Sequence, residues 1–486
     1  MGNGEERMQD EAGKSNGLDN QVLGPLEIFG QSVGNTGMAT VVAIAPVLVA
    51  ESAGNGSWLS MLIALVGVLG VGYCVALFGR RVATSGSLYT YAARSLGRAP
   101  AFLTGWALLI AYVGLAVAMP MIGAQFVGEV IGEGTAVQIV LWFVFAAVAT
   151  GMAYFGARVS TRAALLLEAF SIALLGVVLV ATVVKAGTVI DSAQLHLKGV
   201  SVHDLFLGIT LSVTAFVGFE SGASLGAEAR DPHRAIPRVI LLTIGLAGVI
   251  YMLSFYVETL GYHHLNENIA TADAPTAVLG DWVGLGFLKY PIALGLGFSF
   301  FAVMLASVNA LSRMLYTMAR EGVAPAAFGR THPVRRTPHV GILTIAPFLF
   351  VVSLIMKYVA NASPVEVFSY IATPATFGFI FAYVLVAVGA VVLLYRERRR
   401  IRLGVLTAAT VGVAAMIATY VANLTPVPPY PFNILPYVFL GLMVVGGLVF
   451  LALRFGRPES VRRVGTVDEE SLDRELATPP AMTVSA

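Results

Sequence analysis

Residues 205–227 read LFLGITLSVTAFVGFESGASLGA and carry one charged side chain, Glu220. The run is long enough to cross roughly 30 Å of hydrocarbon as a helix that rises about 1.5 Å per residue. Gly218 and Gly222 flank Glu220 at mid-depth. Because a helix in lipid must satisfy its own backbone groups, such a cluster is expected only where the chain faces protein or water. The stretch therefore predicts a membrane helix that is broken at Gly218–Gly222.

A second stretch, residues 28–50, has the same character. It is uncharged, and Gly34-Asn35-Thr36-Gly37 separates two apolar segments within it. The two stretches are the first and the sixth predicted spans, so they are five spans apart. Because five is odd, a repeat of spans 1–5 in spans 6–10 has the opposite orientation in the membrane. Interrupted hydrophobic segments at matching places in two halves indicate the binding site of an inverted-repeat transporter.

The composition of the whole chain is that of a membrane protein. Of its 486 residues 57% are hydrophobic and 12% are charged, and the mean hydropathy is +0.80. Roughly a quarter of a soluble domain is charged, so a soluble enzyme is excluded. The 30 basic and 28 acidic residues give a net charge of +2, which argues against a nucleic-acid partner. A single cysteine, Cys74, allows no intramolecular disulfide, and we expect no cofactor.

The other spans follow from runs without charged residues. The run 403–453 is too long for one helix, and its Pro-rich part at 425–436 divides it into two. The span at 163–184 contains one acid, Glu168. We predict an all-α integral membrane protein with about twelve transmembrane helices. The predicted spans are residues 28–50, 52–79, 99–128, 134–157, 163–184, 205–227, 239–257, 290–312, 337–356, 367–395 and two within 403–453.

The distribution of basic residues predicts the orientation. Of the 30 Lys and Arg residues, all but Lys185, Lys198, Lys289 and Lys357 fall on one side of the predicted topology. Lys and Arg are retained on the cytoplasmic side of a membrane. We therefore predict a multi-pass protein of the plasma membrane, in contact with lipid, with both termini in the cytoplasm.

Polar ends flank a single membrane domain. We expect disordered cytoplasmic tails at residues 1–23 and 456–486, around a transporter domain at 24–455. Within this domain the inverted repeats are predicted at about residues 24–187 and 203–395. The last two helices, at about 401–455, lie outside the repeats.

Three stretches carry motifs beyond plain hydrophobicity. Residues 216–237, FVGFESGASLGAEARDPHRAIP, combine a Gly-Phe-Glu break with an acidic-Pro turn. Residues 307–338 read SVNALSRMLYTMAREGVAPAAFGRTHPVRRTP, and residues 84–97 read TSGSLYTYAARSLG. These stretches resemble the sixth helix, the eighth helix and the loop after the second helix of the amino acid-polyamine-organocation permeases. The resemblance covers about residues 24–455 and implies a leucine-transporter-type fold with five-plus-five inverted repeats.

The two breaks predict how a zwitterion binds. The break in the first span exposes amides near Gly37–Thr40 at a positive helix end, which attracts a carboxylate. The break in the sixth span leaves the carbonyls near Phe216, Val217 and Gly218 without helical partners, and these attract an ammonium group. The predicted substrate-binding residues at the breaks are Gly34, Asn35, Thr36, Gly37, Met38, Phe216, Val217, Gly218 and Phe219. The resemblance implies, in addition, Tyr112, Thr214, Phe298, Phe301 and Ser369.

Coupling is predicted from buried polar residues. An ionisable Glu220 at mid-membrane either carries a proton or only hydrogen-bonds the loosened backbone. Some members of the resembling family hold a lysine midway along the fifth helix, and the corresponding position here is near Ser171. No lysine stands at this position. The space that its ammonium group would fill either holds sodium, ligated by carbonyls near Gly34 and by the Ser307 hydroxyl, or is empty in an exchanger. For Glu168 we expect a structural partner on a neighbouring helix.

The loops on the basic side carry opposite charges close together, among them Glu228 and Arg230. Such residues form a cytoplasmic gate if their pairs differ between two conformations. The alternative interpretation is that the basic residues anchor the protein to anionic lipid.

These observations predict a secondary active transporter that moves an amino acid by alternating access, through H⁺- or Na⁺-coupled symport or exchange. A polyamine or ethanolamine is the alternative substrate, although a polyamine requires further acids in the pocket. An integral-membrane enzyme or a nutrient sensor is a more distant alternative. The sequence contains no G-x-x-x-x-G-K-[ST] phosphate loop and no H-E-x-x-H metal motif, so we do not expect an enzyme.

Overall fold

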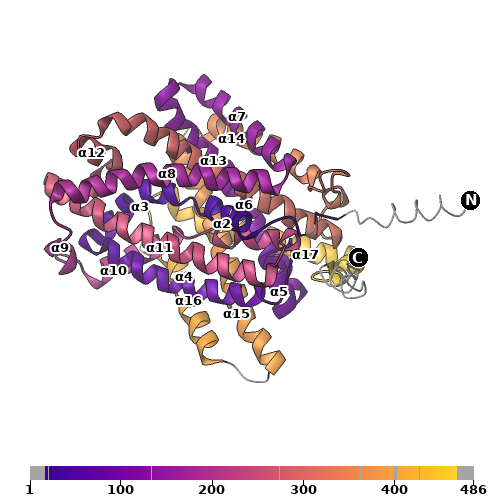
Figure 1. The fold of residues 1–486 in the computed structure, drawn as a ribbon. Coiled ribbons are helices and arrows are strands. Elements are labelled where there is room, and N and C mark those ends of the chain that lie inside the picture. The colour runs from indigo at the N-terminus through magenta and orange to yellow at the C-terminus, as the bar shows by residue number, and fades with distance from the viewer. Residues whose placement is uncertain are drawn as a thin grey trace, which may run out of the picture.

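The structure is a computed structural model that describes residues 17–19, 21–132, 134–272, 274–360, 363–398, 402–425 and 427–467. Within these ranges the regular structure is helical, and one isolated bridge joins Leu23 to Ala229. The predicted all-α class is confirmed. Figure 1 shows a bundle of long helices, in which α5 and the end of α17 lie on the right of the view and α9 and α12 on the left.

The helices before the second break are α2 (Pro25–Thr36), α3 (Met38–Ala53), η1 (Gly54–Gly56), α4 (Ser57–Gly79), α5 (Leu88–Leu96), α6 (Arg98–Ile131), α7 (Thr135–Phe155), α8 (Ala157–Ala186), α9 (Ser192–Leu195) and α10 (Val202–Thr214). Those after it are η2 (Phe219–Glu228), α11 (Pro232–Leu265), η3 (Ile269–Thr271), α12 (Pro275–Trp282), η4 (Gly286–Leu288), α13 (Lys289–Arg320), η5 (Ala326–Gly329), α14 (His339–Ala360), α15 (Pro364–Arg398), α16 (Leu403–Ala422), η6 (Phe432–Ile434), α17 (Leu435–Gly456) and α18 (Pro458–Arg462). Each predicted span therefore coincides with one of these helices or with a pair of them.

Eleven helical segments of the described chain are long and apolar enough to cross a membrane. The first, Pro25–Gly79, has 55 residues, whereas one crossing needs about 20. It comprises α2 and α3 on one side of η1 and α4 on the other. The predicted total of twelve crossings and the inverted repeat stay predictions.

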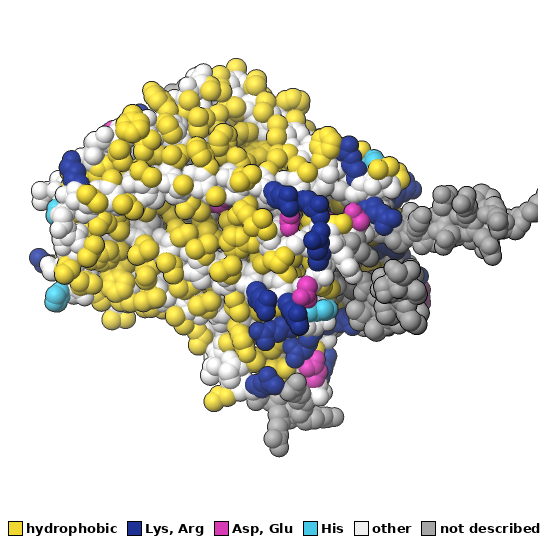
Figure 2. All heavy atoms as spheres, viewed as in Figure 1, with side chains coloured by type: hydrophobic (Ala, Val, Ile, Leu, Met, Phe, Trp, Pro, Cys, Tyr) yellow, Lys and Arg dark blue, Asp and Glu magenta, His cyan; other side chains and the backbone are white. Residues whose placement is uncertain are grey.

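The apolar surface explains the high hydropathy of the chain. Leu166 and Val184 on α8 are 71% and 76% exposed, and Phe455 on α17 is 81% exposed. Figure 2 shows hydrophobic side chains covering the broad middle of the visible face, while most basic side chains there lie in the right part of the view. Exposed leucine and valine at such density suit contact with lipid tails rather than with water.

The ordered chain is longer than predicted at both ends. Leu18 and Leu23 are buried, although residues 1–23 were expected to be disordered. At the other end, α18 lies inside the predicted tail 456–486, and the Gly465 N–H donates to Glu321 at 2.8 Å. Val461 and Val464 are also buried, so these two apolar side chains hold the otherwise polar segment against the domain. The rest of both tails lies outside the described residues.

Candidate functional site

Both predicted breaks are present, and they lie against each other. Gly37 separates α2 from α3 with φ of +60°, and Gly218 precedes η2 with φ of +93°. A Cβ at Gly218 would lie 2.5 Å from Nδ2 and 2.7 Å from the carbonyl oxygen of Asn35. Glycine is therefore required at Gly218 by its backbone conformation and by the close approach of α2.

The N-terminal end of α3 carries the amides that were predicted to hold a carboxylate. The Gly37 N–H donates to the carbonyl of Val33 at 3.1 Å, and the Ala39 N–H donates to the carboxylate of Glu168 at 2.7 Å. Glu168 comes from α8 and is fully buried, so it is the structural partner expected on a neighbouring helix. These two amides are not available to a substrate, whereas Thr40, one residue further on, lines the pocket beside the break.

The C-terminal end of α10 supplies the opposite polarity. Within the described part of the chain, the carbonyl oxygens of Ala215, Phe216 and Val217 accept no hydrogen bond. The Gly218 carbonyl, which was predicted to belong to this group, accepts instead from the Ser221 amide at 3.1 Å and from Asn35 Nδ2 at 3.4 Å. The set of unpaired carbonyls is thus shifted by one residue, because the break closes on Gly218 itself.

A pocket of about 420 Å³ lies beside both breaks. Its lining extends along α3 to Leu48 and includes Asn423 and Phe432, in the connection between α16 and α17. Those residues lie on the side that the basic residues predict to be extracellular. Among the predicted substrate residues, the pocket is lined by Asn35, Thr36, Thr214, Val217 and Ser369.

The remaining predicted substrate residues do not line the pocket. On α13 the reason is helical phase. The ring of Phe298 lies 6.3 Å from that of Phe170 near the lipid-facing surface, and Phe301 packs at 5.4 Å against Phe145 of α7. The others outside the lining are Gly34, Gly37, Met38, Tyr112, Phe216, Gly218 and Phe219, which are buried in the contacts between helices.

Several apolar residues that line the pocket were not predicted from the sequence. Phe300 and Val303 of α13 are three residues apart, and Leu115 and Met119 of α6 are four apart. Residues at these spacings share one face of a helix. The spacing itself was visible in the sequence, but which face of an all-apolar helix meets the pocket depends on tertiary packing.

Tyr112 and Phe219 surround Glu220 rather than the pocket. The Tyr112 hydroxyl donates to one oxygen of Glu220 at 2.8 Å, and the Tyr383 hydroxyl donates to the other. Tyr383 also accepts from the Gly218 N–H at 3.1 Å, and its ring packs at a tilt of 33° against that of Phe219, with centroids 5.0 Å apart. Glu220 is fully buried, so both of its oxygens are held by tyrosines of α6 and α15. Tyr383 carried no signal in the sequence.

The residues of the predicted sodium site have separate partners. The Ser171 hydroxyl donates to the Gly295 carbonyl at 2.6 Å, and the Ser307 hydroxyl donates to Asn35 Oδ1 at 2.8 Å. A Cβ at Gly34 would lie 2.9 Å from that of Ala164, so α2 packs closely on α8 there. Ser171 and Ser307 are therefore not brought together, and a cation at Gly34 would share the oxygens that Asn35 and Ser307 already use.

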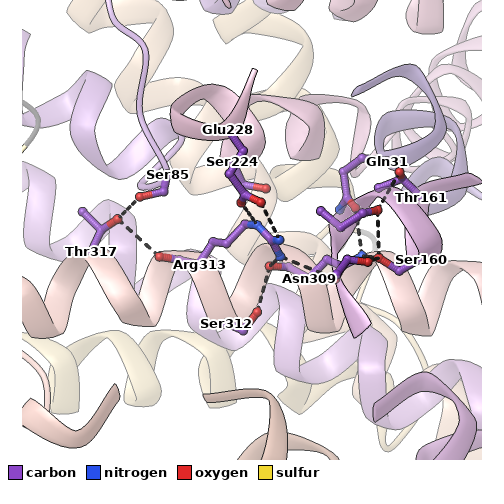
Figure 3. A network of polar contacts seen from close by, with 12 residues as sticks. Gln31, Ser85, Ser160, Thr161, Ser224, Glu228, Asn309, Ser312, Arg313 and Thr317 are labelled. Carbon is purple, nitrogen blue, oxygen red and sulfur yellow. Dashed lines mark hydrogen bonds and ion pairs between the residues drawn. The ribbon is translucent and has the colours of Figure 1, made fainter. Parts of the chain in front are cut away.

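On the side of the breaks away from the pocket, a polar network joins η2, α2, α8 and α13. Figure 3 shows Arg313 directed at Glu228, with Asn309, Gln31 and Ser160 beyond it. Arg313 Nε lies 2.5 Å from Glu228 Oε1 and Nη2 lies 3.2 Å from Oε2, and both side chains are buried. Asn309 Nδ2 donates to Ser160 at 2.9 Å and to Gln31 at 3.3 Å. The pocket is therefore closed on this side.

Of the predicted gate residues, only Glu228 belongs to this network. Arg230 lies at the surface, where its Nε donates to the Gln21 carbonyl at 3.2 Å. Its amide donates to the Leu23 carbonyl at 2.9 Å, which pairs the chain before α2 with the chain after η2. Arg313 was assigned to the loops from the sequence, because it stands near the end of an apolar run.

The chain matches a protein-family model described as amino acid permease over residues 23–449. It is 30% identical over 370 residues to cationic amino acid transporter 4 of Mus musculus, covering 71% of this chain and 55% of that protein. It is 24% identical over 312 residues to a branched-chain amino acid permease of Bacillus subtilis, covering 60% of this chain and 65% of that protein. It is 26% identical over 296 residues to a low-affinity putrescine importer of Escherichia coli, covering 58% of this chain and 63% of that protein.

The alignments span less than two thirds of the length of these relatives. The family model, in contrast, covers nearly all of the described helices and both breaks. The family and the relatives named are transporters and not enzymes. This chain belongs to the amino acid permease family.

Proposed function

We propose that this protein is a secondary active transporter that moves an amino acid across the membrane by alternating access. One observation carries the proposal. Two helix ends of opposite polarity, the N-terminus of α3 and the C-terminus of α10, meet beside one pocket. Helix N-termini attract anions, and unwound carbonyls attract cations, so a zwitterion fits between them.

The contacts narrow the place of each substrate group. The amides of Gly37 and Ala39 are already bonded, which supports Thr40 as the proposed site of the carboxylate. The ammonium is placed at the carbonyls of Ala215 and Val217, which both line the pocket. This recognition uses backbone atoms of both breaks, and any side-chain preference must come from the remaining walls.

Alternating access requires that the pocket open to one side at a time. In this structure the pocket extends towards Leu48 and Phe432, and the Arg313–Glu228 pair closes the other side. The opposite conformation requires that α2 and η2 separate from α13, which breaks this buried pair. The pair is therefore the proposed gate on the side of the chain ends.

The same side is proposed to be cytoplasmic. Figure 2 shows most basic side chains of the visible face on the right of the view, which is this side, and Lys and Arg are retained on the cytoplasmic side. Both termini are then cytoplasmic, and the protein is proposed to lie in the plasma membrane.

Two coupling ions are compatible with the mechanism. A proton at Glu220 would change the charge between Tyr112 and Tyr383 next to the second break. Sodium near Gly34 and Ser307 is the alternative, and exchange without an ion is the third. Uptake at two pH values, with sodium or with choline, separates the three.

The test is uptake of amino acids by proteoliposomes that contain the purified protein. A Gly218→Leu variant should lose uptake, because its side chain would enter the space of Asn35. Gly441→Leu on α17 is the matched control, since it is exposed and a Cβ there meets no atom within 4 Å. Equal uptake by the Gly218 variant and the control would contradict a site at the breaks. Binding without any uptake would instead favour a sensor.

A further inference from the structure

The walls of the pocket beyond the two helix ends have a distinct chemistry. None of the described residues that line the pocket is an acid, a base or a histidine. Its polar side chains are neutral, such as Thr214, Ser369 and Asn423. Next to Gly37 the wall is formed by Val303, whose Cγ2 lies 2.5 Å from the place that a Cβ at Gly37 would take.

The buried acids nearest to the breaks are not open to a substrate. Both oxygens of Glu220 accept hydrogen bonds from tyrosines, and Glu220 is absent from the lining. One oxygen of Glu168 holds the Ala39 amide at 2.7 Å, on the side of α3 that faces α8. Glu168 is also absent from the lining, although its other oxygen accepts no hydrogen bond within the described part of the chain. Either carboxylate could therefore pair with a cationic group in the pocket only if the surrounding helices moved.

A cationic side chain would be poorly accommodated in such a pocket. A charge that leaves water must be paired and hydrogen-bonded, or its burial is strongly unfavourable. An apolar side chain, in contrast, gains stability from leaving water in proportion to its buried area. The walls thus select an apolar substrate side chain in two ways: they contact it, and they offer no charged partner to a cationic one.

We infer that the substrate is an amino acid with a neutral, aliphatic side chain of the leucine, isoleucine or valine class. This inference rests on the proposed function and adds the side-chain class to it. The side chain occupies the space between α6, α13 and α15, against Leu115, Met119, Phe300, Val303 and Phe368. Phe300 and Phe368 form one edge-to-face pair there, with ring centroids 6.2 Å apart. The substrate's charged groups remain at Thr40 and at the carbonyls of α10.

The test compares uptake of leucine, lysine, glutamate and putrescine by the same proteoliposomes. We expect leucine to be transported and the three charged compounds to be at least about tenfold poorer in kcat/KM. Transport of lysine or putrescine without leucine would overturn this inference but leave the proposed transporter intact. If the protein transports none of these four compounds and no other amino acid, both this inference and the proposed transporter function are overturned.

Variants on α13 test the placement of the side chain. Phe300→Ala should reduce leucine uptake about tenfold or more, because it removes the pocket wall. Phe298→Ala is the matched control, since Phe298 lies two residues away beside Phe170 and outside the lining. Val303→Asp should lower leucine uptake and raise competition by lysine, which a merely misfolded variant would not do. Equal effects of the Phe298 and Phe300 variants would contradict the assignment.

Discussion

At the scale of single residues, two buried carboxylates are held by different kinds of donor. Glu168 caps the N-terminus of α3 through the Ala39 amide, whereas Glu220 is bonded by the hydroxyls of Tyr112 and Tyr383. Acids inside a membrane domain are costly, and each must find partners. Their partners belong to helices that meet at the breaks. The two acids therefore link the geometry of the site to the packing of α6, α8 and α15.

The Glu168 contact predicts a difference between two substitutions. Glu168→Leu leaves the buried Ala39 N–H without an acceptor, which costs about 1–3 kcal/mol of stability. Glu168→Gln keeps an oxygen in the same place, so the loss should be smaller. Melting temperatures of the purified variants check this, with the exposed Glu51→Gln on α3 as control. Equal melting temperatures for the Leu and Gln variants would refute the capping role.

Tyr383 should matter more than Tyr112. Tyr383→Phe removes the donor to Glu220 and the acceptor of the Gly218 amide, whereas Tyr112→Phe removes one donor. We expect the Tyr383 variant to lose more stability and more transport. Tyr395→Phe, whose residue is 52% exposed, serves as control. The double variant should show coupling, because both tyrosines contact one carboxylate.

At the scale of elements, the positions of the helices could be predicted because lipid imposes a minimum length of apolar sequence. The breaks could also be predicted, since Gly37 and Gly218 stand inside such runs. The phase of α13 could not be predicted, because nearly every residue from Ile292 to Ser312 is apolar or small. A helix with no polar face gives no sign of which side meets the pocket. Phe300 was missed for that reason, and Arg313 because its ion pair is made with a distant element.

The Arg313–Glu228 pair joins α13 to η2, and breaking it should open the gate. Glu228→Gln leaves a buried arginine without its counter-ion, which costs about 3–5 kcal/mol in the closed conformation. We expect increased labelling of a Ser224→Cys reporter by a thiol reagent. The native Cys74 is buried, so background labelling is low. Glu459→Gln, which breaks the exposed Arg462–Glu459 pair, is the matched control and should change nothing. Unchanged labelling in the Glu228 variant would contradict the gate.

The loop between α8 and α9 contributes a pH-dependent contact. Asp191, between α8 and α9, is partly buried, which favours its neutral form, but hydrogen bonds from Gln194 and His263 outweigh this and lower the pKa of its carboxyl. A lowered pKa stabilises the fold above the ordinary value near 4, and the stabilisation is lost as the pH falls through the folded pKa. Melting temperatures below pH 5 should therefore fall more steeply for the wild type than for Asp191→Asn. Parallel curves would contradict this.

At the scale of the whole molecule, the pocket and the Arg313 network lie on opposite sides of the two breaks. The pocket extends from the breaks to the connection of α16 and α17, while the network around Arg313 closes the other side. The family assignment and the breaks agree on a transporter. The names of the relatives give cationic amino acids, branched-chain amino acids and putrescine as their substrates. The side-chain class inferred for this chain rests instead on the uncharged walls of its own pocket.

The proposed mechanism depends on recognition of a zwitterion by the two helix ends. The most direct measurement is the shift in melting temperature of the purified protein with leucine, with 3-methylbutylamine and with 4-methylpentanoate. The three share the aliphatic body, but the amine lacks the carboxylate and the acid lacks the ammonium group. A ligand that binds the folded state raises the melting temperature. We predict a shift with leucine alone, and a shift of equal size with either analogue would contradict the account.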